Sequence, residues 1–132
     1  MAEDRNVVCT IKDGLGEVHI SEEVVARIAA VAATEVRGVS AMAGNITRDL
    51  IYKLPSKYLA KGVKVEMIGR SVSVSLALKI YYEYSIPKTA AKVQEKVKSA
   101  IETMTGLSVN DVNIKIVAVD MDPEPAEEST HS

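Results

Sequence analysis

The chain has 132 residues, of which 47% are hydrophobic and 26% are charged, and its formal net charge is −2. This length suits one domain, and because tryptophan and phenylalanine are absent, aliphatic side chains must build the core. A single cysteine excludes an internal disulfide framework, and no run approaches the ~20 apolar residues of a membrane-spanning helix, so we expect a cytoplasmic protein without a transmembrane segment.

The N-terminal part of the chain predicts an extension, a strand and a helix. Residues 1–15 form the extension; they lack the apolar segment of a secretory signal, and residues 7–11 within them are a candidate edge strand. Residues 17–20 alternate between polar and apolar side chains, which predicts a short strand. Ser21 can cap a following helix whose first two residues are acidic, so we expect a helix over about residues 22–36.

This first helix carries apolar side chains around most of its circumference. One arc suits packing on the sheet of the same domain; it contains Val24, Val25, Ile28, Val31, Ala32 and Val36. A second arc holds the small residues Ala26, Ala30 and Ala33 and has no evident partner except the segment that follows the helix. We interpret this arc, with Arg27 and Arg37 beside it, as a candidate surface for self-association or partner docking.

The middle segment, residues 40–62, has no clear pattern. A short helix is predicted over residues 47–54, before Pro55. Its apolar residues Leu50, Ile51 and Leu54 provide the alternative for the small-residue arc, since they could fold over it.

Positive charge collects in the middle segment and just after it. The basic residues are Arg48, Lys53, Lys57, Lys61 and Lys64. Two tyrosines are interleaved with them, so this candidate anionic-partner patch could contact the phosphates of a nucleic acid or anionic lipid head groups. The alternative is a solvated basic loop with no role.

The clearest pattern is a β-hairpin. Apolar and polar residues alternate over residues 63–68, and the alternation resumes at residue 71 after a Gly-Arg pair. A two-residue loop with glycine first suits a type II′ turn. This turn places Val65 opposite Val74, so the apolar side chains of both strands share one face.

A second helix and a last strand complete the predicted fold. The helix runs from Pro87 to about Thr105, and its apolar stripe contains Val93, Val97, Ala100, Ile101 and Met104. The strand covers about residues 109–119, with Val112, Ile114, Ile116 and Ala118 on one face. The order β-α-β-β-α-β over residues 16–119 predicts an α+β fold, in which two main helices pack on one face of a small, mostly antiparallel sheet.

Residues 120–132 contain five acids, two prolines and no Lys or Arg. We expect an acidic, disordered tail because this segment has little to bury. Such a tail either shields a basic surface, binds a partner, or has no role.

The titratable residues form no catalytic or metal-binding pattern. Cys9 has no neighbour at metal-ligand spacing, His19 points away from the core face, and the helix dipole explains the paired Glu22 and Glu23. We therefore predict no enzyme activity, no metal and no cofactor. Nucleic-acid binding is also unexpected, because an RNA-recognition motif needs aromatic residues where this long strand carries Ser71, Ser73, Ser75 and Ala77.

Several short blocks follow one another in a specific order between residues 16 and 119. They are EVHIS at 17–21, VVARIA at 24–29, VRGV at 36–39, KGVKV at 61–65, IP at 86–87, VQEKV at 93–97 and MTGL at 104–107. In their order and spacing they resemble the alkaline-shock-protein family of bacterial envelope stress-response proteins. The resemblance implies a cytosolic domain without known catalytic residues, which acts through protein contacts in envelope homeostasis. It also implies self-assembly or association with the membrane through partner proteins.

From the residues and the resemblance together, we expect a non-enzymatic interaction protein of the envelope stress response. We expect it to form a homo-oligomer and to have a membrane-anchored protein partner. Two alternatives remain open: a nucleic-acid-binding module that uses the basic region 48–64, and a regulatory partner of a lipid-metabolism enzyme. Steep salt dependence of RNA or DNA binding would favour the first alternative.

Overall fold

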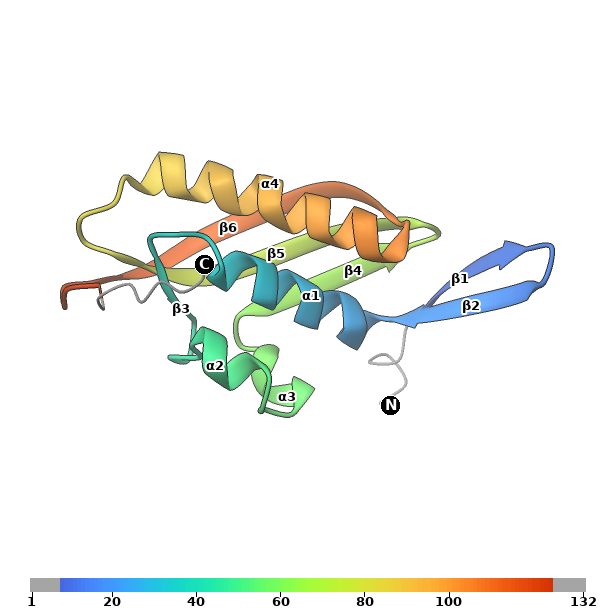
Figure 1. Cartoon of the computed structure of the whole chain (residues 1–132), viewed down its shortest axis with the longest axis horizontal. Coiled ribbons are helices and arrows are strands. Elements are labelled where there is room, and N and C mark those ends of the chain that lie inside the picture. Colours follow the sequence, from blue (N-terminus) through green and yellow to red (C-terminus); the bar gives the residue numbers. More distant parts are fainter. Residues whose placement is uncertain (1–7, 125–132) are drawn as a thin grey trace.

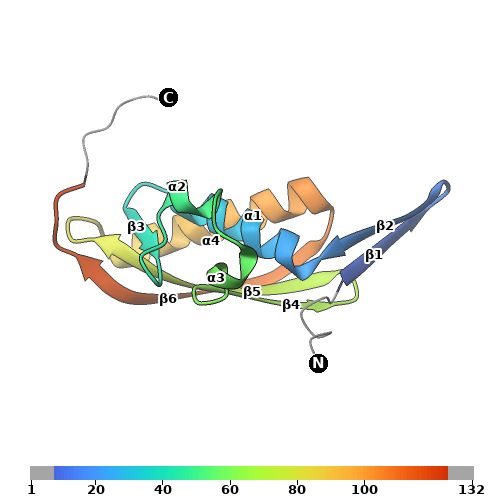
Figure 2. The same ribbon diagram turned by 90° about the horizontal axis from the view of Figure 1, so that it is seen from below.

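Two long helices lie on one face of a four-stranded sheet (Figures 1 and 2). The structure, a computed structural model, describes residues 8–124. The long helices are α1 (Glu22–Thr34) and α4 (Ile86–Thr105), and the sheet contains β3 (Val39–Met42), β4 (Val63–Ile68), β5 (Ser71–Tyr81) and β6 (Ser108–Asp120). The short helices α2 (Arg48–Ile51) and α3 (Ser56–Leu59) connect β3 to β4, while β1 (Val8–Asp13) and β2 (Gly16–Ser21) form a separate hairpin. The predicted α+β fold class is confirmed.

Strand β5 is the centre of the sheet. One edge of β5 pairs antiparallel with β4 through residues 71–76 and with β3 through residues 78–80. Its other edge pairs with β6 in parallel, which requires the crossover through α4. The predicted β4–β5 hairpin is confirmed with Val65 opposite Val74, and Gly69 has a φ of 61° in the two-residue turn.

The core lies between the sheet and the helices. The side chains of β5 that face the helices are fully buried or nearly so: Val72, Val74, Leu76, Leu78 and Ile80. Helix α4 contributes the fully buried Val93, Val97 and Ile101, as the apolar stripe predicts. The residues that alternate with the core residues of β5 remain partly or largely exposed, so one face of the sheet is covered and the other is open.

Helix α4 begins and ends where the sequence predicts. The hydroxyl of Ser85 accepts a hydrogen bond from the Lys88 N–H at 3.3 Å, and Pro87 lies in the first turn. At the other end Gly106 adopts the left-handed conformation, with φ 77°, and its N–H donates to the carbonyl of Glu102.

The structure corrects the expected position of the first strand. Strand β2 contains the predicted residues 17–20, but it pairs only with β1 and lies outside the four-stranded sheet. The candidate edge strand 7–11 coincides largely with β1 and is therefore no edge of the main sheet. Strand β3 pairs with β5 instead; it was not predicted because its residues are nearly all buried and show no alternation.

A bulge in β6 reverses the expected faces of its last residues. Leu78 pairs with Ile116 and Lys79 with Ala118, which leaves Val117 as the extra residue. Ala118 therefore lies on the open face of the sheet rather than on the core face.

The first residues of the predicted acidic tail have defined partners. Asp120 is the last residue of β6 and accepts a hydrogen bond from the Ser40 hydroxyl at 2.6 Å. Glu124 accepts one from the Tyr84 hydroxyl at 2.7 Å. Residues 120–124 are thus held in place, in contrast to the expected disorder, because hydroxyl groups of the domain bind their carboxylates. The expected disorder of residues 125–132 lies outside the described residues.

Candidate functional site

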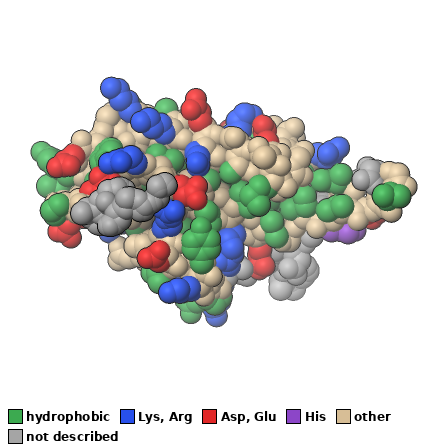
Figure 3. Space-filling view, viewed as in Figure 1, with side chains coloured by type: hydrophobic (Ala, Val, Ile, Leu, Met, Phe, Trp, Pro, Cys, Tyr) green, Lys and Arg blue, Asp and Glu red, His purple; other side chains and the backbone are tan. Residues whose placement is uncertain are grey.

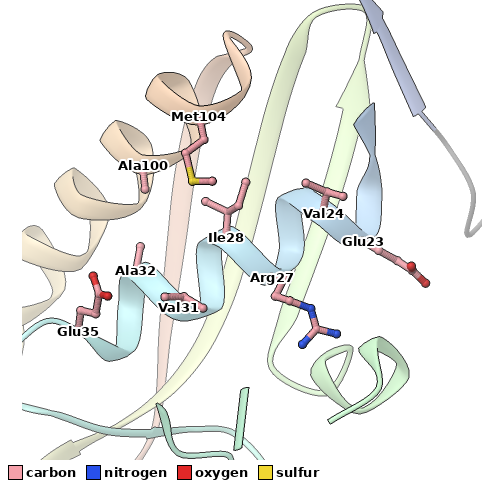
Figure 4. A pocket seen from close by; sticks show the side chains of 9 residues that line it. All are labelled: Glu23, Val24, Arg27, Ile28, Val31, Ala32, Glu35, Ala100 and Met104. Carbon is pink, nitrogen blue, oxygen red and sulfur yellow. The ribbon is translucent and has the colours of Figure 1, made fainter. Parts of the chain in front are cut away.

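An apolar groove runs between α1 and α4 on the side of the helices away from the sheet (Figure 4). Its volume is about 560 Å³, and its apolar lining consists of Val24, Ile28, Val31, Ala32, Ala100 and Met104. Val24 is 48% exposed and Met104 is 70% exposed. Two large hydrophobic side chains thus remain in contact with water where two packed helices meet, which is a feature of binding surfaces.

The spacing of the hydrophobic residues on α1 explains why the groove is apolar. Val24, Ile28 and Val31 follow one another at spacings of four and three residues and so share one side of the helix. The opposite side is buried and contains Val25, Ala29, Ala30 and Ala33, while the buried Ala32 lies between the two sides and also lines the groove. Because both sides are apolar, packing α1 on the sheet leaves hydrophobic side chains uncovered on the outside.

The structure corrects the candidate docking surface on α1. Ala30 and Ala33 are 0% exposed and Ala26 is partly buried, so the small-residue arc belongs to the core. The structure instead has the alternative arrangement, in which the segment that follows α1 folds over the arc. Residues 48–59 pack against α1 and bury Ile51. Small side chains suit this position because they let neighbouring backbone approach closely.

Arg27 and Arg37 do not form one surface. The Arg27 guanidinium donates hydrogen bonds to the carbonyl oxygens of Ile51, at 2.5 Å, and Leu54, at 3.1 Å, and so fastens the segment after α2 to α1. Arg37 lies beyond the C-terminal end of α1, where it interacts with Tyr84 and lines a different hollow.

Charged groups lie at the edges of the groove. Glu23 and Glu35 are near its two ends along α1, and the stem of Arg27 lies between them (Figure 4). Glu35 also approaches Lys96, with 3.7 Å between the carboxylate and the ammonium group. The charges therefore border the groove, while its floor consists of hydrocarbon side chains.

Glu102 fixes the end of α4 next to the groove. Its Oε2 accepts hydrogen bonds from the Val109 N–H at 2.9 Å and from the Lys98 ammonium at 3.0 Å. These bonds, the one from Val109 above all, lower the pKa of the Glu102 carboxyl below its ordinary value. They also connect the last turn of α4, which carries Met104, to the start of β6.

The basic residues of the candidate anionic-partner patch are all exposed, but they face different hollows; they are Arg48, Lys53, Lys57, Lys61 and Lys64. Lys57 and Lys64 line a hollow that also contains Glu22 and Glu23. Lys61 and Lys64 line a second one, on the open face of the sheet, together with Lys115. Arg48 and Lys53 line neither of these two.

Lys115 was not recognised from the sequence as a neighbour of these lysines. It lies far from them along the chain, and only the parallel pairing of β6 with β5 brings it near. In the sequence, only its position on the polar side of the last strand indicates that Lys115 lies on the open face of the sheet.

The residues considered for catalysis have ordinary surroundings. His19 is exposed, with its Nε2 3.2 Å from the Glu17 carboxylate and its Nδ1 3.0 Å from the Thr10 hydroxyl. Between residues 8 and 124, no group of three or more His, Cys, Asp and Glu side chains could hold a metal ion. In the same part of the chain, none of the helices has the length and apolar character needed to span a membrane.

Comparison with known proteins identifies relatives of the whole domain. Residues 10–121 match the alkaline shock protein 23 family, described as having a cell envelope-related function. The chain is 37% identical over 113 residues to the uncharacterized protein YqhY of Bacillus subtilis (strain 168), an alignment that covers 86% of this chain and 84% of YqhY. It is 32% identical to YloU of the same organism, over 79% of this chain and 88% of YloU.

More distant proteins are also similar. A stress response regulator gls24 homolog of Streptococcus pyogenes (serotype M3, strain ATCC BAA-595 / MGAS315) is 27% identical over 79% of this chain and 59% of its own length. Among solved structures, a variant of the domain titled MamM CTD matches 73% of this chain and 93% of its own, with 16% identity and a TM-score of 0.46.

Proposed function

Because the chain belongs to the alkaline shock protein 23 family, we propose that it is a non-enzymatic interaction protein of the envelope stress response. In this proposal it acts by self-association and by binding a membrane-anchored protein partner. The family description, a cell envelope-related function, supports the cellular role. The stress response regulator named among its relatives supports the link to stress.

The open groove between α1 and α4 is the observation that supports action through protein binding. Removing the exposed part of a large hydrophobic side chain such as Met104 from water favours formation of a complex. The groove offers several such side chains side by side, with the charges at its border. This is the arrangement of a protein-docking surface, in which an apolar centre is surrounded by a polar rim.

The cellular role is tested by deleting the gene in its native host and exposing the cells to alkaline medium and to inhibitors of cell-wall synthesis. We expect the deletion strain to be more sensitive than its parent, and a plasmid copy of the gene to restore growth. A deletion strain that grows like its parent under both stresses would contradict the envelope role.

The groove is tested by complementation with two matched variants. Met104→Glu places a charge in the groove, while Ile68→Glu places one at a similarly exposed hydrophobic residue on β4, outside the groove; the wild-type side chains are 70% and 69% exposed. We expect Ile68→Glu to restore growth and Met104→Glu to fail at equal protein levels. Equal complementation by both variants would show that the groove has no part in the function.

A further inference from the structure

The hairpin formed by β1 and β2 extends away from the rest of the molecule (Figures 1 and 2). Its two strands pair with each other and with no other described strand. One face carries Ile11, which is partly buried against the core, opposite Val18, while the other carries the hydrogen-bonded Thr10 and His19. Val18 is 55% exposed, and Leu15 at the tip is fully exposed. Two-stranded sheets of this kind are at best marginally stable in water unless something covers their apolar face.

The hairpin and the groove lie next to each other on one side of the molecule. Ser21, the last residue of β2, caps α1 directly by accepting a hydrogen bond from the Val24 N–H at 3.3 Å. No residue therefore separates the hairpin from the helix that lines the groove. Figure 3 shows hydrophobic side chains in the groove region and along the extended hairpin in the same view, so both apolar surfaces face the same direction.

The hairpin and the groove also have matching lengths. Six residues of antiparallel strand extend for ~20 Å. The groove follows α1 from Glu23 to Glu35, which corresponds to ~18 Å at the rise of an α-helix. One hairpin is thus long enough to cover one groove and not much longer.

These observations point to a second copy of this chain as the occupant of the groove. We propose that the protein forms a two-fold symmetric dimer in which the β1–β2 hairpin of each copy lies in the α1–α4 groove of the other. Because hairpin and groove begin at the same point, extend from it in opposite directions (Figure 1) and have similar lengths, a two-fold axis beside Ser21 places each hairpin over the groove of the other copy. Each apolar surface is then covered by its counterpart, and the interface is closed. This inference rests on the self-association part of the proposed function.

The symmetry predicts which residues meet. Val18 lies ~12 Å from the junction along the strand, and Val31 lies ~14 Å from it along the helix. Across the two-fold axis, Val18 of one copy therefore faces the helical turn from Ile28 to Val31 of the other. The leucine at the hairpin tip reaches the end of the groove near Glu35.

Disulfide cross-linking tests this pairing. In a Cys9→Ser background, one preparation carries Val18→Cys and a second, differently tagged preparation carries Val31→Cys. After mixing and mild oxidation we expect a covalent heterodimer containing both tags. The matched control replaces the Val18 variant by His19→Cys, which places the thiol on the opposite face of the hairpin and should give little product. Equal yields from the two mixtures would overturn the proposed arrangement.

Measurements of mass in solution provide a second test that does not require oxidation. We expect the wild type to have twice the 14.2 kDa of one chain in sedimentation equilibrium, and both Val18→Asp and Met104→Glu to shift it to the mass of one chain. Ile68→Glu should remain dimeric. The far-UV circular dichroism of all variants should match that of the wild type, since the substituted side chains are exposed.

The two proposals fail in different ways. If the wild type self-associates but Val18→Asp and Met104→Glu do not change its mass, the hairpin-in-groove dimer is wrong and self-association stands. If the wild type is a single chain even at high protein concentration, self-association itself fails and this inference fails with it. In that case the envelope role is still decided separately by the deletion phenotype.

Discussion

Arg27 connects α1 to the segment after α2, and replacing it by alanine measures how much this connection stabilises the fold. The guanidinium donates to two carbonyl oxygens, those of Ile51 and Leu54. A hydrogen bond from a charged group contributes about 1.5–3 kcal/mol. We expect a combined loss of about 2 kcal/mol, less than the sum of two such bonds, because the released carbonyl of the partly exposed Leu54 can bind water.

The loss is measured by urea unfolding followed by far-UV circular dichroism. For a chain of this size it corresponds to a fall in Tm of about 6–10 °C. Arg27→Lys should keep little of the stabilisation, because an ammonium group lacks the planar fork that reaches two acceptors. The matched control is Arg48→Ala on α2, an exposed arginine for which we expect a change within about 0.5 kcal/mol.

Two outcomes would refute this reasoning. If Arg27→Ala changes the free energy of unfolding no more than Arg48→Ala does, the two hydrogen bonds do not hold the segment. If Arg27→Lys is as stable as the wild type, the charge rather than the bidentate geometry is responsible. Hydrogen exchange of the α2 amides provides an independent check, because loss of the contact should speed their exchange while leaving the amides of β5 unchanged.

Three further substitutions test other parts of the structure. Gly38 has a φ of 103°, and an added Cβ would lie 2.7 Å from the Tyr84 ring, so Gly38→Ala should destabilise the fold by about 1–3 kcal/mol in urea unfolding; an unchanged midpoint would contradict this. Ala30→Glu places a carboxylate at a fully buried position and should abolish the cooperative thermal transition. A variant that keeps this transition would show that Ala30 lies at the surface. The bond from Val109 lowers the pKa of Glu102 from 4.5, so its stabilising contribution is present above that value and lost as the pH falls through the lowered pKa. The wild type should therefore lose more stability on acidification below about pH 4.5 than Glu102→Gln, and parallel acid titrations of the two proteins would refute the assignment.

The β4–β5 hairpin could be predicted because its evidence is local. The alternation of the two strands and the Gly-Arg turn between them each specify the same register, and the structure has Val65 opposite Val74. The ends of α4 are local in the same sense, since Ser85, Pro87 and Gly106 act within one turn of the helix.

The orientation of α1 could not be predicted, because both of its sides are apolar and hydrophobicity alone does not distinguish them. The choice depends on the neighbours: the alanines face inward because segments distant in the sequence pack closely there, and Val24 and Ile28 are left on the groove. The strand β3 and the position of Lys115 depend on long-range pairing with β5 in the same way.

Met104 belongs to the predicted apolar stripe of α4 but is 70% exposed. The buried residues of α4 are four apart: Thr89, Val93, Val97, Ile101 and Thr105. Each step of four residues advances ~40° around an α-helix, so the buried line winds around α4 toward its C-terminal end. Met104, which an average stripe includes, therefore turns away from the sheet and lies beside α1 in the groove.

The central position of β5 has a consequence for the order of folding. The β4–β5 hairpin closes the shortest loop of the sheet, since Ile68 pairs with Ser71. The pairings of β5 with β6 and with β3 close longer loops of similar length, as in Ser71 with Ser108 and Val39 with Ile80. Since short loops close with less loss of entropy, the β4–β5 hairpin should form the folding nucleus together with α4, which follows it directly along the chain, and α1 should dock on it afterwards. In stopped-flow experiments, truncation of Ile101 should then slow refolding, whereas truncation of Val25 in α1 should mainly accelerate unfolding.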